Sequence, residues 1–506
     1  MRLPVIFKQM VLRTSAIFLV KVIGALVRIP MFRMLGPEGI GLYEMAYAFY
    51  GFVLSIVSGG FPSALALTTA KNRRRGYGIY WIVFLLLALA GGLCGLASYH
   101  YAPQIAAMFG NPNLVWPLRL LAPAMMIVPL LGITRGFLQG IESYGTIAAS
   151  EVIEQLVRVT TILVCVTMWT SYGIGRAVGG ATFGASTGAF VAFVFLFAVL
   201  MFRMKKREAV SKLPLPLAKR KDTGIIVFFY TSVSVLATRL FIPMADFIDT
   251  LIVPHRLVDS GLTIHQATAI YGEISGMAAT ITYLPTIITA ALSHTLAAKI
   301  TADWARGRMD RFRWRISKAF EFGWLWGAAA SGFLYFYAND LSVLIMGDES
   351  LTNPIRYTSM APMLVGLFEL SNTVIWVTEM RKAPVIGLAV GEVCTIVISY
   401  VLCAIPGMGH LAAAIGLLTL EFVATAWNLG ALKWKVKGFF PLGSIFQETV
   451  VLFGIVGCSF FAVNLLVELL PWSEYMRMIA RLVLSFGLMM LYFLVRFLGF
   501  YKKSLH

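Results

Sequence analysis

The sequence has 506 residues, of which 59% are hydrophobic and only 13% are charged, and its mean hydropathy is +0.80. A water-soluble protein of this length needs more polar surface to cover its core, so the composition excludes a soluble globular protein. A net charge of +18 would suggest nucleic-acid binding in a soluble chain, but here the basic residues form short clusters between apolar stretches. We therefore expect an integral membrane protein without a nucleic-acid partner.

About fourteen apolar stretches are long enough to cross a bilayer, which takes about 20 residues as a helix. Their approximate ranges are 10–34, 40–69, 79–101, 114–139, 147–170, 175–202, 223–251, 267–299, 318–338, 354–378, 384–404, 410–432, 444–470 and 476–498. Lys21 and Arg28 interrupt the first stretch and no small-x-small cleavage site follows, so we interpret it as a retained span rather than a signal peptide. The sequence predicts an all-α polytopic membrane protein.

The basic clusters indicate the topology. They follow even-numbered stretches or end the chain, at 71–75, 203–221, 306–318, 381–382, 433–437 and 502–503. The loops 102–113, 339–353 and 405–409 contain neither lysine nor arginine. Because cytoplasmic loops carry an excess of basic residues, we predict a multi-pass membrane protein with both termini in the cytoplasm.

The longest basic loop divides the chain. We predict a first lobe of six spans at 1–202, a cytoplasmic linker at 203–222, a second lobe at 223–437, and two further spans with a cytoplasmic tail at 438–506. The fourth and tenth stretches both open on an Ala-Pro pair, Ala122-Pro123 and Ala361-Pro362. An offset of six spans preserves orientation, so the two halves would be related by an axis along the membrane normal.

Three groups of charges lie inside the predicted spans, where each charge costs roughly 2.5–3.5 kcal/mol at the bilayer centre. The first group is Lys21, Arg28 and Arg33. Lys21 and Arg28 share a helix face and are candidates to line an aqueous cavity that attracts an anion such as a phosphate, since guanidinium groups form paired hydrogen bonds with phosphate. Alternatively, Lys21 and Arg33 extend to opposite membrane interfaces.

The second group lies at the junction of the fourth and fifth spans. It comprises Arg135, Gln139, Glu151, Glu154 and Arg158. Glu154 and Arg158 have the i,i+4 spacing of a helical ion pair. We expect a polar network that either holds these helices together or takes part in gating; the matched charges favour the structural role.

The third group is on the seventh span, where Arg239, Asp246 and Asp249 would share one helix face around Pro243. The two acids are candidates for carrying a coupling proton or Na⁺, or they balance Arg239. Pro243 would free a backbone carbonyl. Lesser candidates are Glu273, His294 and Glu392.

The sequence shows no catalytic or metal-binding pattern. It lacks a phosphate-binding Gly-rich loop with Lys, a His-Glu-x-x-His and a Gly-x-Ser-x-Gly. The five cysteines have no paired spacing. We therefore expect neither an enzyme nor a cofactor or metal.

Segments spread along the chain carry a family resemblance. They are 27–43, 134–140 with 154–158, and 249–254 with Gly272 and Leu284-Pro285. Together they resemble the stage V sporulation protein B branch of the polysaccharide-transporter families, in the multidrug/oligosaccharidyl-lipid/polysaccharide (MOP) exporter superfamily. The resemblance implies two pseudo-symmetric six-helix lobes around a V-shaped cavity, plus two C-terminal helices.

The resemblance also implies a function. It implies a flippase that moves a lipid-linked oligosaccharide or peptidoglycan precursor by alternating access, in cell-wall, spore-cortex or polysaccharide synthesis. In related MurJ-type flippases cavity arginines engage the pyrophosphate, and Arg28 and Arg33 are similar to them in position. Two features depart from the family pattern: 377–380 replaces a Leu-Gln-Gly, and 59–63 lacks an arginine.

Three rival functions remain open. A cation-coupled drug antiporter of the same fold predicts an acidic first lobe. A membrane polymerase or ligase needs a reactive site, for which the outer loop 252–266 offers few residues. A non-transporting scaffold of a sporulation or cell-envelope complex is the third. For the flippase we expect a lipid-linked glycan and membrane lipid as partners, coupling to Na⁺ or H⁺, and a monomer.

Overall fold

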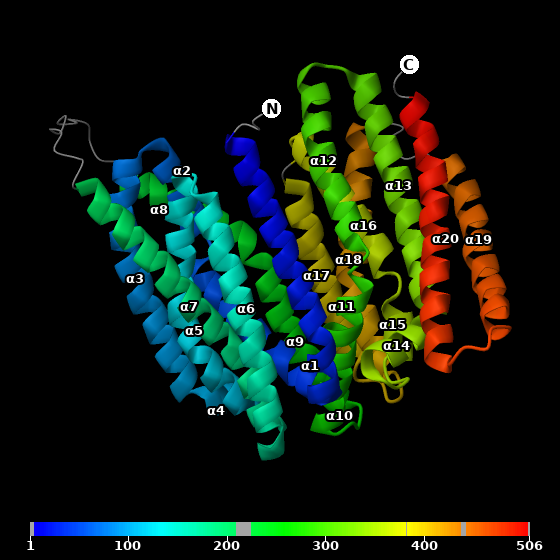
Figure 1. Ribbon diagram of the computed structural model, residues 1–506, viewed down its shortest axis with the longest axis horizontal. Coiled ribbons are helices and arrows are strands. Elements are labelled where there is room, and N and C mark those ends of the chain that lie inside the picture. Colours follow the sequence, from blue (N-terminus) through cyan, green and yellow to red (C-terminus); the bar gives the residue numbers. More distant parts are fainter. Residues whose placement is uncertain (1–4, 209–223, 381, 437–441, 504–506) are drawn as a thin grey trace. The chain divides into compact units, whose positions relative to one another are not determined.

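The structure, a computed structural model, describes residues 5–208, 224–380, 382–436 and 442–503, and every regular element in these ranges is helical (Figure 1). The predicted all-α class is confirmed. Most of the predicted linker 203–222 lies outside the described residues. Ten of the described helices are long and apolar enough to cross a membrane, or up to twelve if each of two bent pairs is one span. The predicted count of fourteen is consistent with this and stays a prediction.

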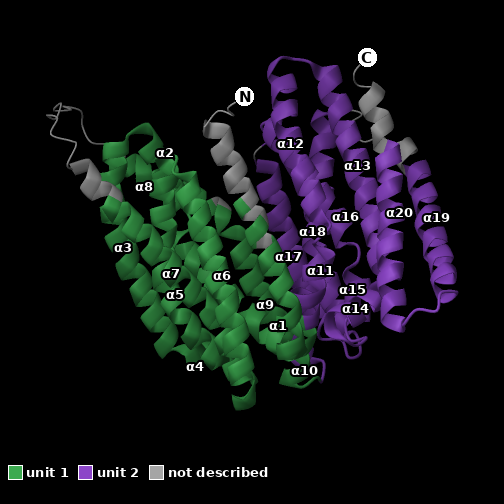
Figure 2. Ribbon diagram, viewed as in Figure 1, with its two compact units in different colours: residues 1–255, 262–272 green, residues 256–261, 273–506 purple. Residues whose placement is uncertain are grey.

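The chain divides into two compact units, residues 1–255 with 262–272 and residues 256–261 with 273–506 (Figure 2). The first unit holds α1 (Val5–Ser58), α2 (Phe61–Lys71), α3 (Arg73–His100), α4 (Ala102–Met108), α5 (Val115–Gly140), α6 (Tyr144–Trp169), α7 (Ile174–Glu208), α8 (Gly224–Arg239), most of α9 (Phe241–Asp259) and α10 (Ile264–Tyr271). The second holds α11 (Ala279–Thr282), α12 (Thr286–Ala305), α13 (Met309–Phe336), α14 (Ala338–Met346), α15 (Thr352–Thr358), α16 (Ala361–Val377), α17 (Lys382–Leu402), α18 (Gly409–Lys435), α19 (Leu442–Glu468) and α20 (Glu474–Lys503). The predicted lobe boundaries stay a prediction.

The helix α1 contains two antiparallel segments. Its backbone breaks at Gly36, whose φ of 65° lies in the left-handed region that favours glycine. In a straight helix Arg28 and Glu44 would be about 24 Å apart. Their side chains instead approach to 3.6 Å, so the chain reverses at Gly36. The predicted first span thus lies in the first arm of α1, and the predicted second span, 40–69, covers the second arm and most of α2.

Glycines of α7 bring its backbone close to α6. A Cβ atom at Gly184 would lie 2.8 Å from the backbone oxygen of Arg158, and one at Gly188 would lie 2.7 Å from that of Glu154. Small residues four apart permit this approach between membrane helices. The packing holds α6, which carries the charges of the second predicted group, in a defined position.

The arms of α1 also meet α10 at backbone contact. A Cβ atom at Gly41 would overlap the backbone oxygen of Thr268, and one at Gly272 would overlap that of Pro37. Asn111 donates a hydrogen bond to the Thr268 hydroxyl at 2.9 Å. No larger residue fits at either glycine without separating the helices.

The two halves of the chain repeat their turns. Gly110 and Glu142 of the first half have a positive φ, as do Gly347 and Glu379 of the second half. The same number of residues separates the two members of each pair. The turns that contain Glu142 and Glu379 make the same hydrogen bonds, from Glu142 N to Gln139 O (3.0 Å) and from Glu379 N to Trp376 O (3.3 Å). These pairs indicate an internal repeat of helices.

The Ala-Pro pairs noted in the sequence do not align in this repeat. More residues separate Pro123 from Pro362 than separate Glu142 from Glu379, the residues of the matching turns. Pro123 lies inside the continuous helix α5, whereas Pro362 occupies the first turn of α16. A proline in the first turn needs no intrahelical hydrogen bond, so the two prolines have different local roles.

Ion pairs fasten the last two helices to α13 inside the second unit. Glu321 of α13, with a side chain 1% exposed, pairs with Lys318 at 2.6 Å and with Arg496 of α20 at 3.1 Å. Arg496 also reaches Glu448 of α19 at 2.8 Å. Nearer the start of α20, Arg481 forms two hydrogen bonds with the Asp340 carboxylate.

Glu142 is an exposed non-glycine residue with a φ of 59°. A left-handed conformation costs an L-residue with a Cβ atom about 1–2 kcal/mol. We therefore expect Glu142→Gly to stabilise the protein by about 1 kcal/mol in reversible unfolding in mixed micelles. Glu142→Ala keeps the Cβ atom and should give no such gain. A less stable Glu142→Gly variant would show that the glutamate side chain contributes more than the backbone strain costs.

Candidate functional site

The candidate site begins with Arg28, on the first arm of α1. Its guanidinium lies 3.6 Å from the Glu44 carboxylate on the second arm, and the two side chains are 37% and 23% exposed. The reversal at Gly36 creates this pair. Arg33 is exposed, and the Lys21 side chain lies outside the described residues. The predicted roles of these three basic residues stay predictions.

Glu154 of α6 sits between two arginines. Its carboxylate pairs with Arg135 of α5 at 2.9 Å and with Arg158 one turn further along α6. Arg135 also donates a hydrogen bond to the Ser150 hydroxyl at 3.1 Å. The structure thus contains the ion pair that the i,i+4 spacing predicts, and adds Arg135 as a second partner.

Two other members of the second predicted group lie apart from these ion pairs. Gln139 is exposed near the end of α5. Glu151 is partly buried, and its Oε2 atom has no hydrogen-bond partner among the described residues. The gating role proposed for the group stays a prediction.

Three tyrosines of α1 connect Arg28 with Arg158. The rings of Tyr43 and Tyr47 lie 4.4 Å apart and those of Tyr47 and Tyr50 lie 5.9 Å apart. Arg158 lies near all three tyrosines, and Arg28 lies near Tyr43. We refer to residues 28, 43, 44, 47, 50, 154 and 158 of the first unit as the polar track.

The acids of α9 join this track. Glu44 interacts electrostatically with Asp246. Tyr271 of α10 lies near Asp246, Asp249 and Glu44. Its hydroxyl is 2.7 Å from the hydroxyl of Thr250. Asp246 of the predicted seventh span thus lies near Glu44, the partner of Arg28.

Arg239 does not belong to this group of acids. Helix α8 ends at Arg239 and α9 begins at Phe241, with a bend of 42° between them. A proline ring clashes with the carbonyl four residues earlier, which for Pro243 is that of Arg239. The expected single helix face of Arg239, Asp246 and Asp249 is therefore wrong, because the helix breaks between the arginine and the acids. Arg239 itself is exposed.

Glu273 belongs to the second unit. It pairs with His410, at the start of α18, and lies in a π-helical turn, Gly272–Ala278. Tyr283 donates a hydrogen bond to Glu421, next to the bend of 54° that precedes α12. Of the lesser candidates, Glu392 is buried and His294 is exposed.

The sequence reasoning missed Glu44. It named no candidate residue on the second span, yet Glu44 lies eight positions after Gly36, as Arg28 lies eight before it. A reversal at Gly36 would have predicted their pairing. The i,i+4 spacing of Tyr43 and Tyr47 on the same helix was a second signal.

Among the described residues, no group of three or more His, Cys, Asp or Glu is arranged to hold a metal ion. The chemistry that the polar track can perform is reversible exchange of ionic partners. Arginine can bind a carboxylate or a phosphate in the same way.

Glu154 offers a test of the ion pairs. Glu154→Gln leaves Arg135 and Arg158 without their shared counter-charge, so we expect a loss of about 2–3 kcal/mol in unfolding free energy in mixed micelles. The control is Glu349→Gln, at an exposed loop position. If both variants unfold like the wild type, the ion pairs do not stabilise the unit.

Comparison with known proteins identifies the family of this chain. The family model described as polysaccharide biosynthesis protein matches residues 6–297. The chain is 25% identical to stage V sporulation protein B of Bacillus subtilis (strain 168) over 433 residues, which cover 83% of each protein. It is 24% identical to the lipid II flippase MurJ of the same organism over 414 residues, covering 76% of this chain and 75% of the relative. The resemblance inferred from the motifs is confirmed.

Solved structures share the fold. A lipid II flippase MurJ in an inward closed conformation matches with a TM-score of 0.70 at 13% identity, covering 98% of this chain and 100% of that one. An inward-facing multidrug resistance MATE family transporter of the MOP superfamily matches with a TM-score of 0.66 at 13% identity, covering 85% and 98%. The chain is a multi-pass membrane protein with the fold of these structures, and it belongs to the polysaccharide biosynthesis protein family.

Proposed function

We propose that this chain is a flippase that moves a lipid-linked glycan intermediate across the bacterial cytoplasmic membrane by alternating access. The observation that carries the proposal is the Arg28–Glu44 pair, an exchangeable ionic contact on membrane-spanning segments of a chain of this family. The relatives named above, a flippase and a sporulation protein, agree with a role in cell-wall or spore synthesis. Neither name denotes an enzyme, which agrees with transport without catalysis.

The proposed substrate contact is an exchange at Arg28. At 3.6 Å the ion pair with Glu44 is loose, and the guanidinium is 37% exposed. A pyrophosphate head group offers more charge and more acceptor atoms than one carboxylate. It would therefore displace Glu44, while the polyprenyl tail stays in the lipid.

Displacement of Glu44 provides a way to couple transport to an ion. Once released, Glu44 stands near Asp246, with Asp249 on the same helix α9. Carboxylates held close together cannot all remain ionised without a proton or a cation. The proposed cycle takes up H⁺ or Na⁺ there, and one unit charge crossing the membrane gains about 2.3 kcal/mol per 100 mV.

The proposed orientation has both termini in the cytoplasm, because the basic clusters of the sequence all fall on one side of the alternating spans. The head group then enters from the side of those clusters. We propose a monomer as the working unit, since the polar track is complete within one chain.

A cation-coupled antiporter is the second candidate. That rival predicts an acidic first lobe; Glu44 is an acid of that lobe, and it lies near Asp246 of α9 in the first unit. Drug resistance on expression, combined with an unchanged rate of lipid flipping, would favour the antiporter.

Arg28→Ala tests the substrate contact. In proteoliposomes with a fluorescent undecaprenyl-pyrophosphate-linked sugar, we expect flipping to slow by about tenfold or more, because a charge-assisted contact is lost. Arg306→Ala removes an exposed charge elsewhere and should flip at the wild-type rate. Wild-type flipping by Arg28→Ala would remove Arg28 from the mechanism.

Glu44→Gln tests the exchange. The variant removes the competitor for Arg28, so we expect tighter equilibrium binding of the pyrophosphate lipid together with a loss of stimulation by a pH or Na⁺ gradient. Fluorescence titration measures the first effect and gradient-driven flipping the second. Weaker binding in Glu44→Gln would mean that Glu44 supports the substrate rather than competing with it.

A further inference from the structure

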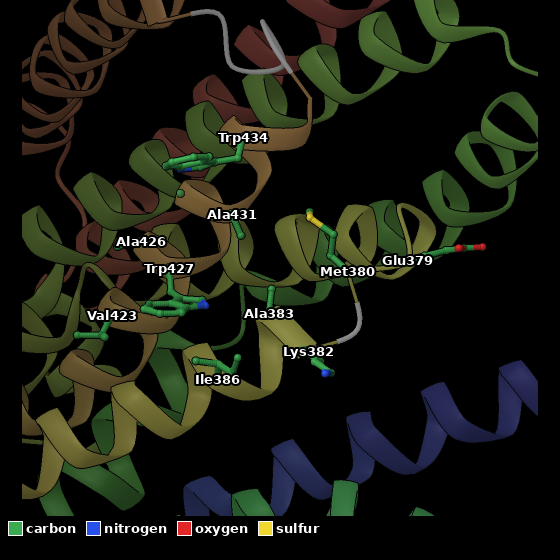
Figure 3. A pocket seen from close by; sticks show the side chains of 11 residues that line it. Glu379, Met380, Lys382, Ala383, Ile386, Val423, Ala426, Trp427, Ala431 and Trp434 are labelled. Atoms are coloured by element: carbon green, nitrogen blue, oxygen red, sulfur yellow. The ribbon is translucent and has the colours of Figure 1, made fainter.

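The second unit contains an apolar cavity. Its volume is about 980 Å³, near the upper end of the range of about 300–1,000 Å³ typical of small-molecule sites. It lies between the turn that joins α16 to α17 and the last turns of α18, and its walls include Ile386, Val423, Trp427 and Trp434 (Figure 3). The charged residues of the lining are Glu379 and Lys382.

The walls suit an apolar group. A Cβ atom at Gly387 would lie 2.9 Å from Cδ1 of Trp427, so only glycine lets the indole lie against α17. A Cβ atom at Gly430, which lines the cavity, would meet nothing within 4 Å. The absence of side chains at these two positions gives the cavity its wall and its depth.

The entrance has the features of a membrane interface. Trp434 is 90% exposed and Trp427 is 41% exposed, and tryptophans of membrane proteins are enriched where lipid head groups meet the hydrocarbon. Lys382 stands at the rim, and Lys433 and Lys435 are exposed on the same end of α18. The Glu379 carboxylate points away from the two indoles (Figure 3).

We propose that this cavity binds an anionic membrane phospholipid, with one acyl chain between Trp427 and Ile386 and its phosphate beside Lys382. The apolar walls match an acyl chain, and the basic rim matches a head group with a net negative charge. The proposal is independent of the transport function.

Binding of phosphatidylglycerol to the purified full chain tests the proposal. Native mass spectrometry during a lipid titration should show tighter binding of phosphatidylglycerol than of phosphatidylcholine. Gly430→Leu places a side chain in the cavity and should abolish the tight binding. The matched control is Gly457→Leu on α19, where an added side chain also meets nothing within 4 Å, and it should bind like the wild type.

The charge of the rim is tested separately. Lys382→Gln should bind phosphatidylglycerol about fivefold more weakly, the effect expected for one lysine near a membrane surface. Arg313→Gln, an exposed residue outside the cavity, should not change binding. Equal binding of both lipids, unchanged binding in Gly430→Leu with its melting temperature intact, or displacement of phosphatidylglycerol by undecaprenyl pyrophosphate would each overturn the proposal. Because no step requires transport, a failure here leaves the flippase test unaffected.

Discussion

The cost of an unpaired charge in hydrocarbon governs the interior of this protein. A helix that crosses a bilayer satisfies its backbone but not its ionised side chains, and water is not available to do so. Arg28 therefore meets Glu44, Glu154 meets two arginines, and Glu321 meets a lysine and an arginine. Some of these pairs join residues one turn apart on one helix, and the others join different helical segments. The need for a partner therefore also influences how the helices pack together.

The ion pairs differ in how easily they can be exchanged. The Arg28–Glu44 contact is long and both side chains are partly exposed. Glu321 is almost completely buried and has two cationic partners. The first arrangement suits a site at which a ligand replaces one partner, and the second suits a permanent fastening. Burial and the number of partners thus separate a functional charge from a structural one where residue type cannot.

Features with a local cause could be predicted from the sequence, and those with a distant cause could not. Long apolar stretches and basic loops predicted the membrane helices, since both signals act within about 20 residues. The pair Glu154–Arg158 followed from helical spacing. The contact of Arg28 with Glu44 required the reversal at Gly36, and the separation of Arg239 from Asp246 depended on where the helix broke near Pro243. The lipid cavity depends on which helix faces α17 at Gly387, information that no single span contains.

The fastening of α13 by α20 has a consequence for synthesis of the protein. Arg496 follows Glu321 by 175 residues, which at about 5–20 residues per second takes the ribosome roughly 10–35 s. Throughout that interval α13 exists without its later partner, and Lys318, one turn away, is the cation already present beside the carboxylate. Lys318 is thus the cationic partner that Glu321 has before α20 is made. The last two helices add Arg496 and Glu448 to this group of charges only at the end of synthesis.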